Sequence, residues 1–196
     1  METKIDRRVQ RTHKRLQEAL IELINEQEYD TVTVQEIVDR ANVGRTTFYE
    51  HFGSKDDLFM TCHEAIVSKF HHLHSLPQPL LSSEAPAGII SAYRHLLESR
   101  TMLYPIFQSH DGAIILRRIR DGSAQEIEAA LHAIFTEAES AIPFDLLANY
   151  LAGAQIALVQ WWLEKRQPHP PETLAQAFHR LQRAAIRDAF GLQDDE

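Results

Sequence analysis

Residues 42–58 read NVGRTTFYEHFGSKDDL and contain two candidate helix starts, ten residues apart. Gly44 precedes RTTFYEHF and Ser54 precedes KDDLF, and both residue types are favoured at the position just before a helix. Adjacent side chains on a helix point in different directions, so we expect Phe48 to face the core and Tyr49 to face solvent. The stretch therefore predicts a short helix with a polar outer face, followed at once by another helix.

Two more helices are predicted before this stretch. Thr33 and Glu36 have the spacing of a capping box, in which each side chain satisfies a free backbone donor, and they predict a short helix over 34–40. Apolar residues at helical spacing predict a first helix over about 8–26, with a buried stripe of Leu16, Ala19, Leu20, Leu23 and Ile24. The two short helices should pack against it through Ile37, Ala41, Val43, Phe48 and Phe52.

The remainder of the chain also has helical periodicity. Helices are predicted over residues 55–74, 85–100, 101–109, 112–138, 144–166 and 172–190. The sequence contains no alternating run that is rich in Val, Ile and Thr and bounded by turns, as strands would require. The fold class is therefore predicted to be all-α.

The charge of the chain is unevenly distributed. A formal net charge of -8 argues at first against nucleic acid, because phosphate binding depends on positive charge. Residues 1–15, however, hold six Lys or Arg against two acids, whereas residues 56–196 hold 11 basic and 18 acidic residues. Positive charge gathered at one end is typical of a nucleic-acid binder, so we interpret Arg7, Arg8 and Arg11 as a phosphate-contacting arm, the alternative being a solvated tail.

Cysteine usage and hydropathy favour a cytoplasmic protein without a membrane span. Cys62 is the single cysteine, so an intramolecular disulfide is impossible. The N-terminus is charged where a signal peptide would need an apolar core. The longest apolar stretch, residues 146–163, contains Asn149, Gln155 and Gln160, which are costly in lipid.

The two short helices, joined by residues 41–44, fit a helix-turn-helix, in which the second helix lies in the major groove of DNA. With Phe48 and Phe52 facing inward, its outer face is rich in groups that can reach base edges or phosphates, namely Arg45, Thr46, Thr47, Tyr49, Glu50 and His51. Double-stranded DNA is therefore the predicted partner.

From Thr33 to Leu58 the chain contains the ordered pattern T-V-x-x-I-x-x-x-A-x-V-x-x-x-T-x-Y-x-H-F-x-x-K-x-x-L. This pattern resembles the DNA-binding signature of the TetR family of bacterial transcriptional regulators. The resemblance implies a three-helix DNA-binding domain over residues 1–53. It also implies a larger helical domain over 54–196 that binds an effector and dimerises, with 54–75 as the connecting helix.

The resemblance also implies which side chains contact DNA. Arg45 and Thr46 would face the bases, and Lys55 would meet a phosphate at a helix N-terminus, where free N–H groups and the helix dipole favour an anion. The full set of expected DNA-binding residues is Thr33, Gln35, Arg45, Thr46, Thr47, Tyr49, His51 and Lys55.

Two positions depart from the family pattern. Glu28 stands where the family often has Gly near the end of the first helix, and a left-handed backbone there would strain a non-Gly residue by roughly 1 kcal/mol. Gly44 stands where the family often has a Ser cap, a change worth about a few tenths of a kcal/mol. We therefore expect a locally different turn at Glu28.

We interpret the chain as a homodimeric regulator that binds a near-palindromic operator, most simply a repressor released by a small-molecule effector. One alternative is a regulator that acts through a protein partner and has no effector pocket. The other is a helical enzyme, but no nucleophile-base-acid set, Gly-rich phosphate loop or metal spacing supports it, and no cofactor is expected. The residues leave repression and activation open.

The dimer interface is predicted in residues 144–190. Two long helical patterns separated by Pro168-His169-Pro170-Pro171 can fold back as an antiparallel pair, and two pairs make a four-helix bundle across a two-fold axis. The alternative is that both helices bury their apolar stripes within one subunit. The residues assigned to the interface are Ala154, Phe178, Leu181 and Ala185.

A histidine cluster and the single cysteine are candidates for a metal or redox role. His71, His72 and His74, with His63 earlier on the same predicted helix, could supply only part of a closed ligand set, so we expect no metal. A redox-sensing cysteine needs a lowered pKa and access to solvent. Cys62 lies in an apolar stripe, which favours a packed thiol instead.

Overall fold

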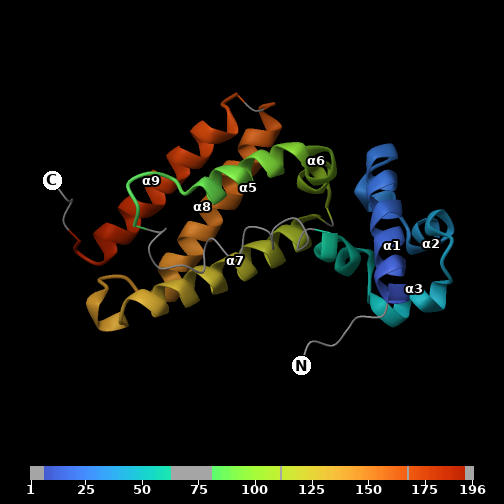
Figure 1. Cartoon of the computed structure of the whole chain (residues 1–196), viewed down its shortest axis with the longest axis horizontal. Helices are drawn as coiled ribbons and strands as arrows, with labels where there is room; N and C mark the ends of the chain where they lie inside the picture. Colours follow the sequence, from blue (N-terminus) through green and yellow to red (C-terminus); the bar gives the residue numbers. More distant parts are fainter. Residues whose placement is uncertain (1–6, 63–80, 111, 167, 193–196) are drawn as a thin grey trace. The chain divides into compact units, whose positions relative to one another are not determined.

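The computed structural model describes residues 7–62, 81–110, 112–166 and 168–192. Across these ranges the chain forms α-helices and short 3-10 turns and has no strand, so the predicted all-α class is confirmed (Figure 1). Within the described ranges no helix is long and apolar enough to cross a membrane.

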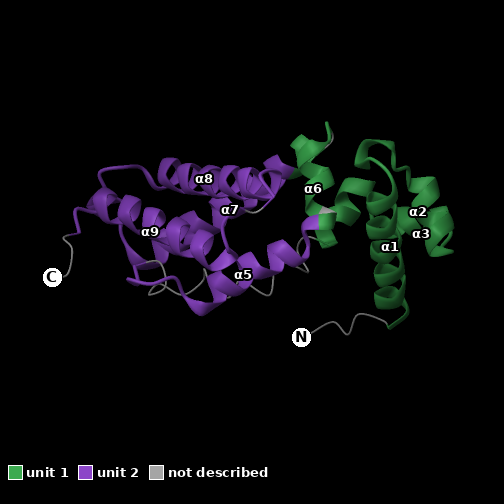
Figure 2. Ribbon diagram, turned by 90° about the horizontal axis from the view of Figure 1, so that it is seen from above, with its two compact units in different colours: residues 1–66, 101–115 green, residues 67–100, 116–196 purple. Residues whose placement is uncertain are grey.

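The chain divides into two compact units (Figure 2). Unit 1 comprises residues 1–66 and 101–115, and unit 2 comprises residues 67–100 and 116–196. The division is not a single cut, because the segment 101–115 joins the N-terminal unit although the residues on both sides of it belong to unit 2. The predicted domain boundary after residue 53 stays a prediction.

Unit 1 begins with three helices close to the predicted bounds. They are α1 (Arg7–Glu26), α2 (Val34–Ala41) and α3 (Arg45–His51), and a further helical segment is described over 55–62. The predicted stripe of α1 is buried, and Ile37, Ala41, Phe48 and Phe52 are also buried, whereas Val43 is only half-buried. The continuation of the predicted helix 55–74, and with it His63, His71, His72 and His74, lies outside the described residues.

The connection between α1 and α2 is a 3-10 turn, η1 (Tyr29–Thr31). Glu28, just before it, has an extended backbone with φ -64° and ψ 137°, so the left-handed strain considered from the sequence does not arise. Tyr29 is fully buried, and its hydroxyl donates a 2.5 Å hydrogen bond to Oδ1 of Asp56. Its ring meets the ring of Phe59 edge-on, with centroids 5.9 Å apart. This turn thereby attaches the α1–α2 connection to the segment that starts at residue 55.

The segment 101–115 contributes α6 (Arg100–Gln108) and the first residues of α7 (Gly112–Ile134). The backbone N–H of His110, between these helices, donates a 2.8 Å hydrogen bond to Oδ2 of Asp30 in η1. Gly112 is required by packing, because an added Cβ would lie 1.9 Å from the carbonyl oxygen of Ile106. The turn from α6 to α7 is thus tight and tied to η1.

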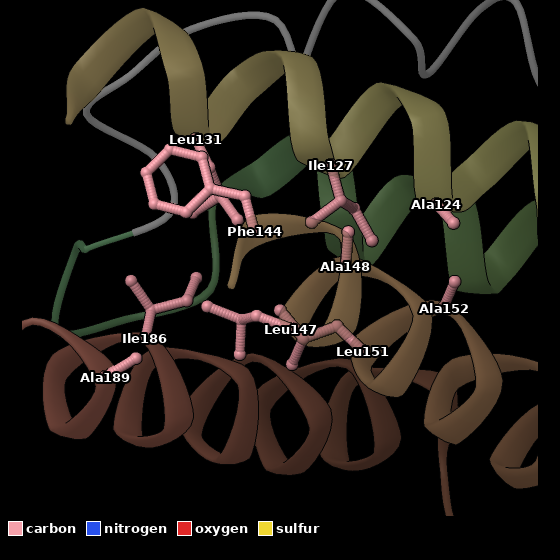
Figure 3. Close-up of a cluster of buried hydrophobic side chains, with 10 residues drawn as sticks. All are labelled: Ala124, Ile127, Leu131, Phe144, Leu147, Ala148, Leu151, Ala152, Ile186 and Ala189. Carbon is pink, nitrogen blue, oxygen red and sulfur yellow. The ribbon is translucent and has the colours of Figure 1, made fainter. Parts of the chain in front are cut away.

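Unit 2 is built mainly from α5 (Ala87–Glu98), the rest of α7, α8 (Phe144–Glu164) and α9 (Pro171–Ala189). Figure 3 shows side chains of α7, α8 and α9 meeting in one apolar cluster, with α8 between the other two. Its members are Ala124, Ile127, Leu131, Phe144, Leu147, Ala148, Leu151, Ala152, Ile186 and Ala189. Burial of these apolar side chains contributes to the stability of the unit.

The predicted helix 112–138 ends earlier than expected, at Ile134. Thr136 has an extended backbone and forms a capping box with Glu139, which starts the 3-10 turn η3 (Glu137–Glu139). The capping box supplies the backbone groups with partners outside α7, so the helix does not continue.

On another face of unit 2, α9 packs along α5 and holds the chain that leads into it. Nε2 of His179 lies 2.9 Å from the carbonyl oxygen of Ser82, and Nε of Arg183 donates to the carbonyl oxygen of Leu81. The side-chain oxygen of Gln176 accepts from the backbone N–H of Ala85. Polar side chains of α9 therefore supply hydrogen-bond partners to backbone groups of residues 81–85, which lie outside the helices.

Gly112→Ala should destabilise the protein by about 1 to 3 kcal/mol, because the new methyl group would meet backbone at the α6–α7 turn. Urea unfolding followed by circular dichroism measures this change. The matched control is Gly122→Ala in the interior of α7, where an added Cβ meets nothing within 4 Å. The free energy of unfolding of that variant should rise by roughly 0.5 to 1 kcal/mol, because Ala has a higher helix propensity than Gly. Equal midpoints for both variants would contradict the packing argument.

A second prediction concerns His13 of α1, whose ring lies 4.9 Å from that of His51 and 4.8 Å from that of Phe52. Burial, with a smaller contribution from His51, lowers the pKa of His13 below 6.5. A histidine with a lowered folded-state pKa costs stability as pH falls from about 6.5 through that pKa, because the unfolded chain binds the proton more readily.

His13→Gln should therefore reduce the loss of thermal stability between about pH 7 and pH 5. The carboxylates whose pKa values are lowered, such as Glu26 and Glu36, titrate below this window. Thermal unfolding at a series of pH values tests the expectation. A variant whose melting temperature falls with pH as steeply as that of the wild type would show that His13 does not carry the effect.

Candidate nucleic-acid interface

The candidate interface includes the N-terminus of α2, where the predicted capping box is confirmed. Oγ1 of Thr33 accepts from the backbone N–H of Glu36 at 3.2 Å, and the Glu36 carboxylate accepts from the backbone N–H of Thr33 at 2.8 Å. The hydrogen bonds from Thr33 lower the pKa of Glu36. Gln35 is exposed, and its amide donates to Asp39 along the same helix. Two of the expected DNA-binding residues therefore lie together at this helix start.

The turn between α2 and α3 has the geometry of a Schellman motif. Asn42 has a left-handed backbone with φ 48° and ψ 54°, and its N–H donates to the carbonyl oxygen of Asp39. The N–H of Val43 donates to the carbonyl oxygen of Val38 at 2.9 Å, which completes the motif. Gly44 follows as the residue before α3 and offers no side chain to cap it.

On α3, one of two adjacent aromatic side chains faces the core and the other faces solvent, as the sequence predicted. Phe48 is fully buried, whereas Tyr49 is 48% exposed. Arg45 and Thr46 are exposed at the start of the helix, and the guanidinium of Arg45 lies 5.7 Å from the centre of the Tyr49 ring. These three side chains form an outer face that can supply hydrogen-bond donors, a positive charge and an aromatic surface.

Two other expected contacts of α3 are less exposed. Thr47 and His51 are half-buried, and the ring of His51 meets that of His13 edge-on. His51 therefore packs against α1 at the end of α3. Whether its remaining surface touches DNA stays a prediction.

Lys55 lies at the start of the next helical segment, as expected, but its ammonium group has partners within unit 1. Nζ donates to the carbonyl oxygen of Tyr29 at 2.9 Å and to that of Asp30 at 3.4 Å. It also lies 4.5 Å from the centre of the Tyr29 ring. The proposed phosphate contact of Lys55 therefore has to coexist with a role in holding η1. Beside it, Ser54 caps the segment by accepting from the backbone N–H of Asp57.

The basic residues expected to form an arm are part of a helix. Arg7, Arg8 and Arg11 lie in the first turns of α1 and are exposed, and the carbonyl oxygen of Arg8 accepts a hydrogen bond from Thr12. Residues 1–6 lie outside the described residues. These positive charges therefore have positions set by α1.

Sequence reasoning missed the polar contacts that attach α2 to α1. Arg40 pairs with Glu26 at 2.7 Å and with Glu22 at 3.4 Å, which raises the pKa of Arg40. Nη2 of Arg15 donates to the carbonyl oxygen of Asn42 at 3.2 Å. A left-handed Asn after a helix is common and could have been predicted, whereas the partners on α1 lie too far away in sequence to be inferred from spacing.

Metal and redox roles find no support among the described residues. No three His, Cys, Asp or Glu side chains converge there as a metal site requires. Cys62 is buried, and burial raises the pKa of its thiol to about 12, so the reactive thiolate is disfavoured.

Two sequence profiles match the chain. The profile described as bacterial regulatory proteins, tetR family, matches residues 16–62, and the one described as transcriptional regulator C-terminal region matches residues 83–184. The chain is 29% identical over 189 residues to the uncharacterized HTH-type transcriptional regulator YxbF of Bacillus subtilis (strain 168), which covers 90% of this chain and 46% of that protein. The chain spans about half the length of the curated relatives it matches.

Solved structures have the same fold. The TetR transcriptional regulator from Streptococcus agalactiae 2603V has a TM-score of 0.60 at 28% identity, covering 90% of this chain and 96% of that chain. RolR in complex with the ligand resorcinol has a TM-score of 0.50 at 21% identity, covering 97% and 99%. Since the profiles match both parts of the chain and α2 and α3 form a helix-turn-helix, the chain belongs to the TetR family of bacterial transcriptional regulators and carries an N-terminal DNA-binding domain.

Proposed function

We propose that the protein is a homodimeric, cytoplasmic repressor that binds a near-palindromic operator and is released from it by a small-molecule effector. The observation that carries this proposal is the outer face of α3, where Arg45, Thr46 and Tyr49 are exposed while Phe48 anchors the helix. Arginine at the start of a recognition helix suits a bidentate contact to guanine in the major groove.

Exposed apolar side chains on α8 and α9 support the dimer. On α8, Leu146 is 61%, Tyr150 63% and Trp161 40% exposed, at spacings that follow one side of the helix. On α9, Leu181 is 67% exposed. Large apolar side chains gathered on the surface of a soluble unit indicate an interface, and two α8–α9 pairs would form a four-helix bundle.

The four interface residues expected from the sequence differ in exposure within one subunit. Leu181 is exposed, Ala154 and Ala185 are half-buried, and Phe178 is only 5% exposed. Phe178 therefore contributes to the interior of its own subunit. In the proposed interface, Leu181 is the contact on α9, together with the small exposed residues Ala177 and Ala184 on the same side.

A dimer explains how one short helix can specify an operator. The two-fold axis would place two copies of α3 about 34 to 36 Å apart, so that they meet successive major-groove faces of a palindrome. An effector that binds more tightly to a different spacing of the two helices would weaken DNA binding by its differential affinity for the two states.

Buried polar side chains in unit 2 support an effector site there. Tyr93 and His179 are each 1% exposed, and Gln182 is 2% exposed. Nδ1 of His179 is buried without a hydrogen-bond partner among the described residues. Buried polar atoms normally have a partner, and a bound ligand with a complementary group would supply it. RolR, which shares the fold, was solved with the ligand resorcinol.

Footprinting on genomic fragments should find a near-palindromic site protected symmetrically in both half-sites. Arg45→Ala should then weaken operator binding by roughly 1 to 3 kcal/mol and relax the base preference at one position of each half-site. The matched control is Arg117→Ala, which removes the same charge from an exposed position on α7 in unit 2. Protection of all sequences alike by the wild type would contradict the proposed operator binding.

Leu181→Glu should convert the dimer into folded monomers, because it places two like charges at the proposed two-fold interface. Sedimentation velocity measures the mass, and circular dichroism checks the fold. The change is at a 67% exposed position, so it should leave the interior of the subunit intact. Ala133→Glu, at an exposed alanine of α7, is the control and should remain dimeric. An intact Leu181→Glu dimer would rule out this interface.

A further inference from the structure

The start of α3 has no side-chain cap, unlike its middle and end, which are anchored in the core. Phe48 and Phe52 anchor the middle and end of the helix in the core. At its beginning, Gly44 has no side chain that could accept from the first free N–H groups of α3. The position of this end, from which Arg45 and Thr46 project, therefore depends strongly on the turn that precedes it.

Arg15 of α1 is the side chain that reaches this turn. Its Nη2 donates a 3.2 Å hydrogen bond to the carbonyl oxygen of Asn42, from 27 residues earlier in the chain. Asn42 is the left-handed residue that reverses the chain after α2. Its carbonyl oxygen accepts the bond from Arg15, so a side chain from another element holds the peptide group that leads into the next residues.

Arg15 also belongs to the basic side of α1. It lies seven residues, or about two helical turns, after Arg8 and one turn after Arg11. By charge alone it would be counted with those residues as one more phosphate contact. A guanidinium group has five N–H donors in a fixed fork, and the bond to Asn42 gives this one a partner inside the protein.

We propose that Arg15 is a positioning residue for sequence-specific recognition, which sets the start of α3 through the Asn42 carbonyl group. The inference rests on the proposed operator binding. Because bidentate contacts to base edges depend on geometry, a shift of the turn would displace Arg45 and Thr46 from the bases. Contacts to phosphates tolerate such a shift, since they read charge and not sequence.

The test compares Arg15→Gln with Arg11→Gln, which removes the same charge one turn earlier on α1. Affinities for the footprinted operator and for a random duplex of equal length are measured over a range of salt concentrations. Arg11→Gln should weaken both duplexes alike and reduce the slope of log affinity against log salt by about 0.9. Its ratio of operator to random affinity should equal that of the wild type.

Arg15→Gln should instead lower the ratio of operator to random affinity about tenfold, as expected when roughly one bidentate base contact is lost. Arg15→Lys keeps the charge, but its ammonium nitrogen ends short of the guanidinium nitrogens. It should retain the wild-type salt slope while its ratio falls between those of the wild type and Arg15→Gln. Arg15→Lys also serves if Arg15→Gln proves unfolded by circular dichroism.

A ratio in Arg15→Gln equal to that of Arg11→Gln would overturn the assignment and make Arg15 an ordinary cation at the DNA surface. In that case the ratio of Arg15→Lys would equal that of the wild type. A wild-type protein that does not distinguish operator from random duplex would contradict the proposed function itself, whereas an undiminished preference in Arg15→Gln would contradict only the role of Arg15.

Discussion

The burial of Tyr29 is the constraint on which unit 1 depends. A buried tyrosine hydroxyl group needs a hydrogen-bond partner, and here it donates to the Asp56 carboxylate, while Lys55 donates to the backbone carbonyl oxygen of the same tyrosine. Both partners lie at the start of the helical segment that follows α3, so the turn before α2 and the segment after α3 are joined. The helix-turn-helix is enclosed between these two points. Asp30, next in the chain, extends the same attachment to the α6–α7 turn through His110.

Basic and acidic residues gather in different halves of α1. The first half has Arg8, Arg11 and Arg15, whereas the second half has Glu22 and Glu26, which bind Arg40 of α2. The acidic part therefore forms intramolecular ion pairs on the surface that attach α2 to α1. In the basic part, Arg15 contacts the turn that leads into α3, so a chain with a net charge of -8 still gathers positive charge on the helix next to the helix-turn-helix.

Local patterns predicted the helices well where the forces are local. The bounds of α1, α2 and α9 were predicted to within one residue, because apolar periodicity and capping residues act within about one turn of each other. The division of Phe48 and Tyr49 between core and solvent follows from the same periodicity. The end of α7 was predicted wrongly, because the periodic pattern continues into residues where the Thr136 capping box starts a new turn.

Residues close together in the chain were enough to predict the all-α class, the positions of α1, α2 and α3, and the resemblance of residues 33–58 to a DNA-binding signature. Three features depend on contacts between distant segments: residues 101–115 join unit 1, Phe178 is buried in unit 2, and Arg15 binds the carbonyl oxygen of Asn42. Spacing cannot predict such contacts. A helix face has several neighbours it could meet, and only the packing of distant segments selects one of them.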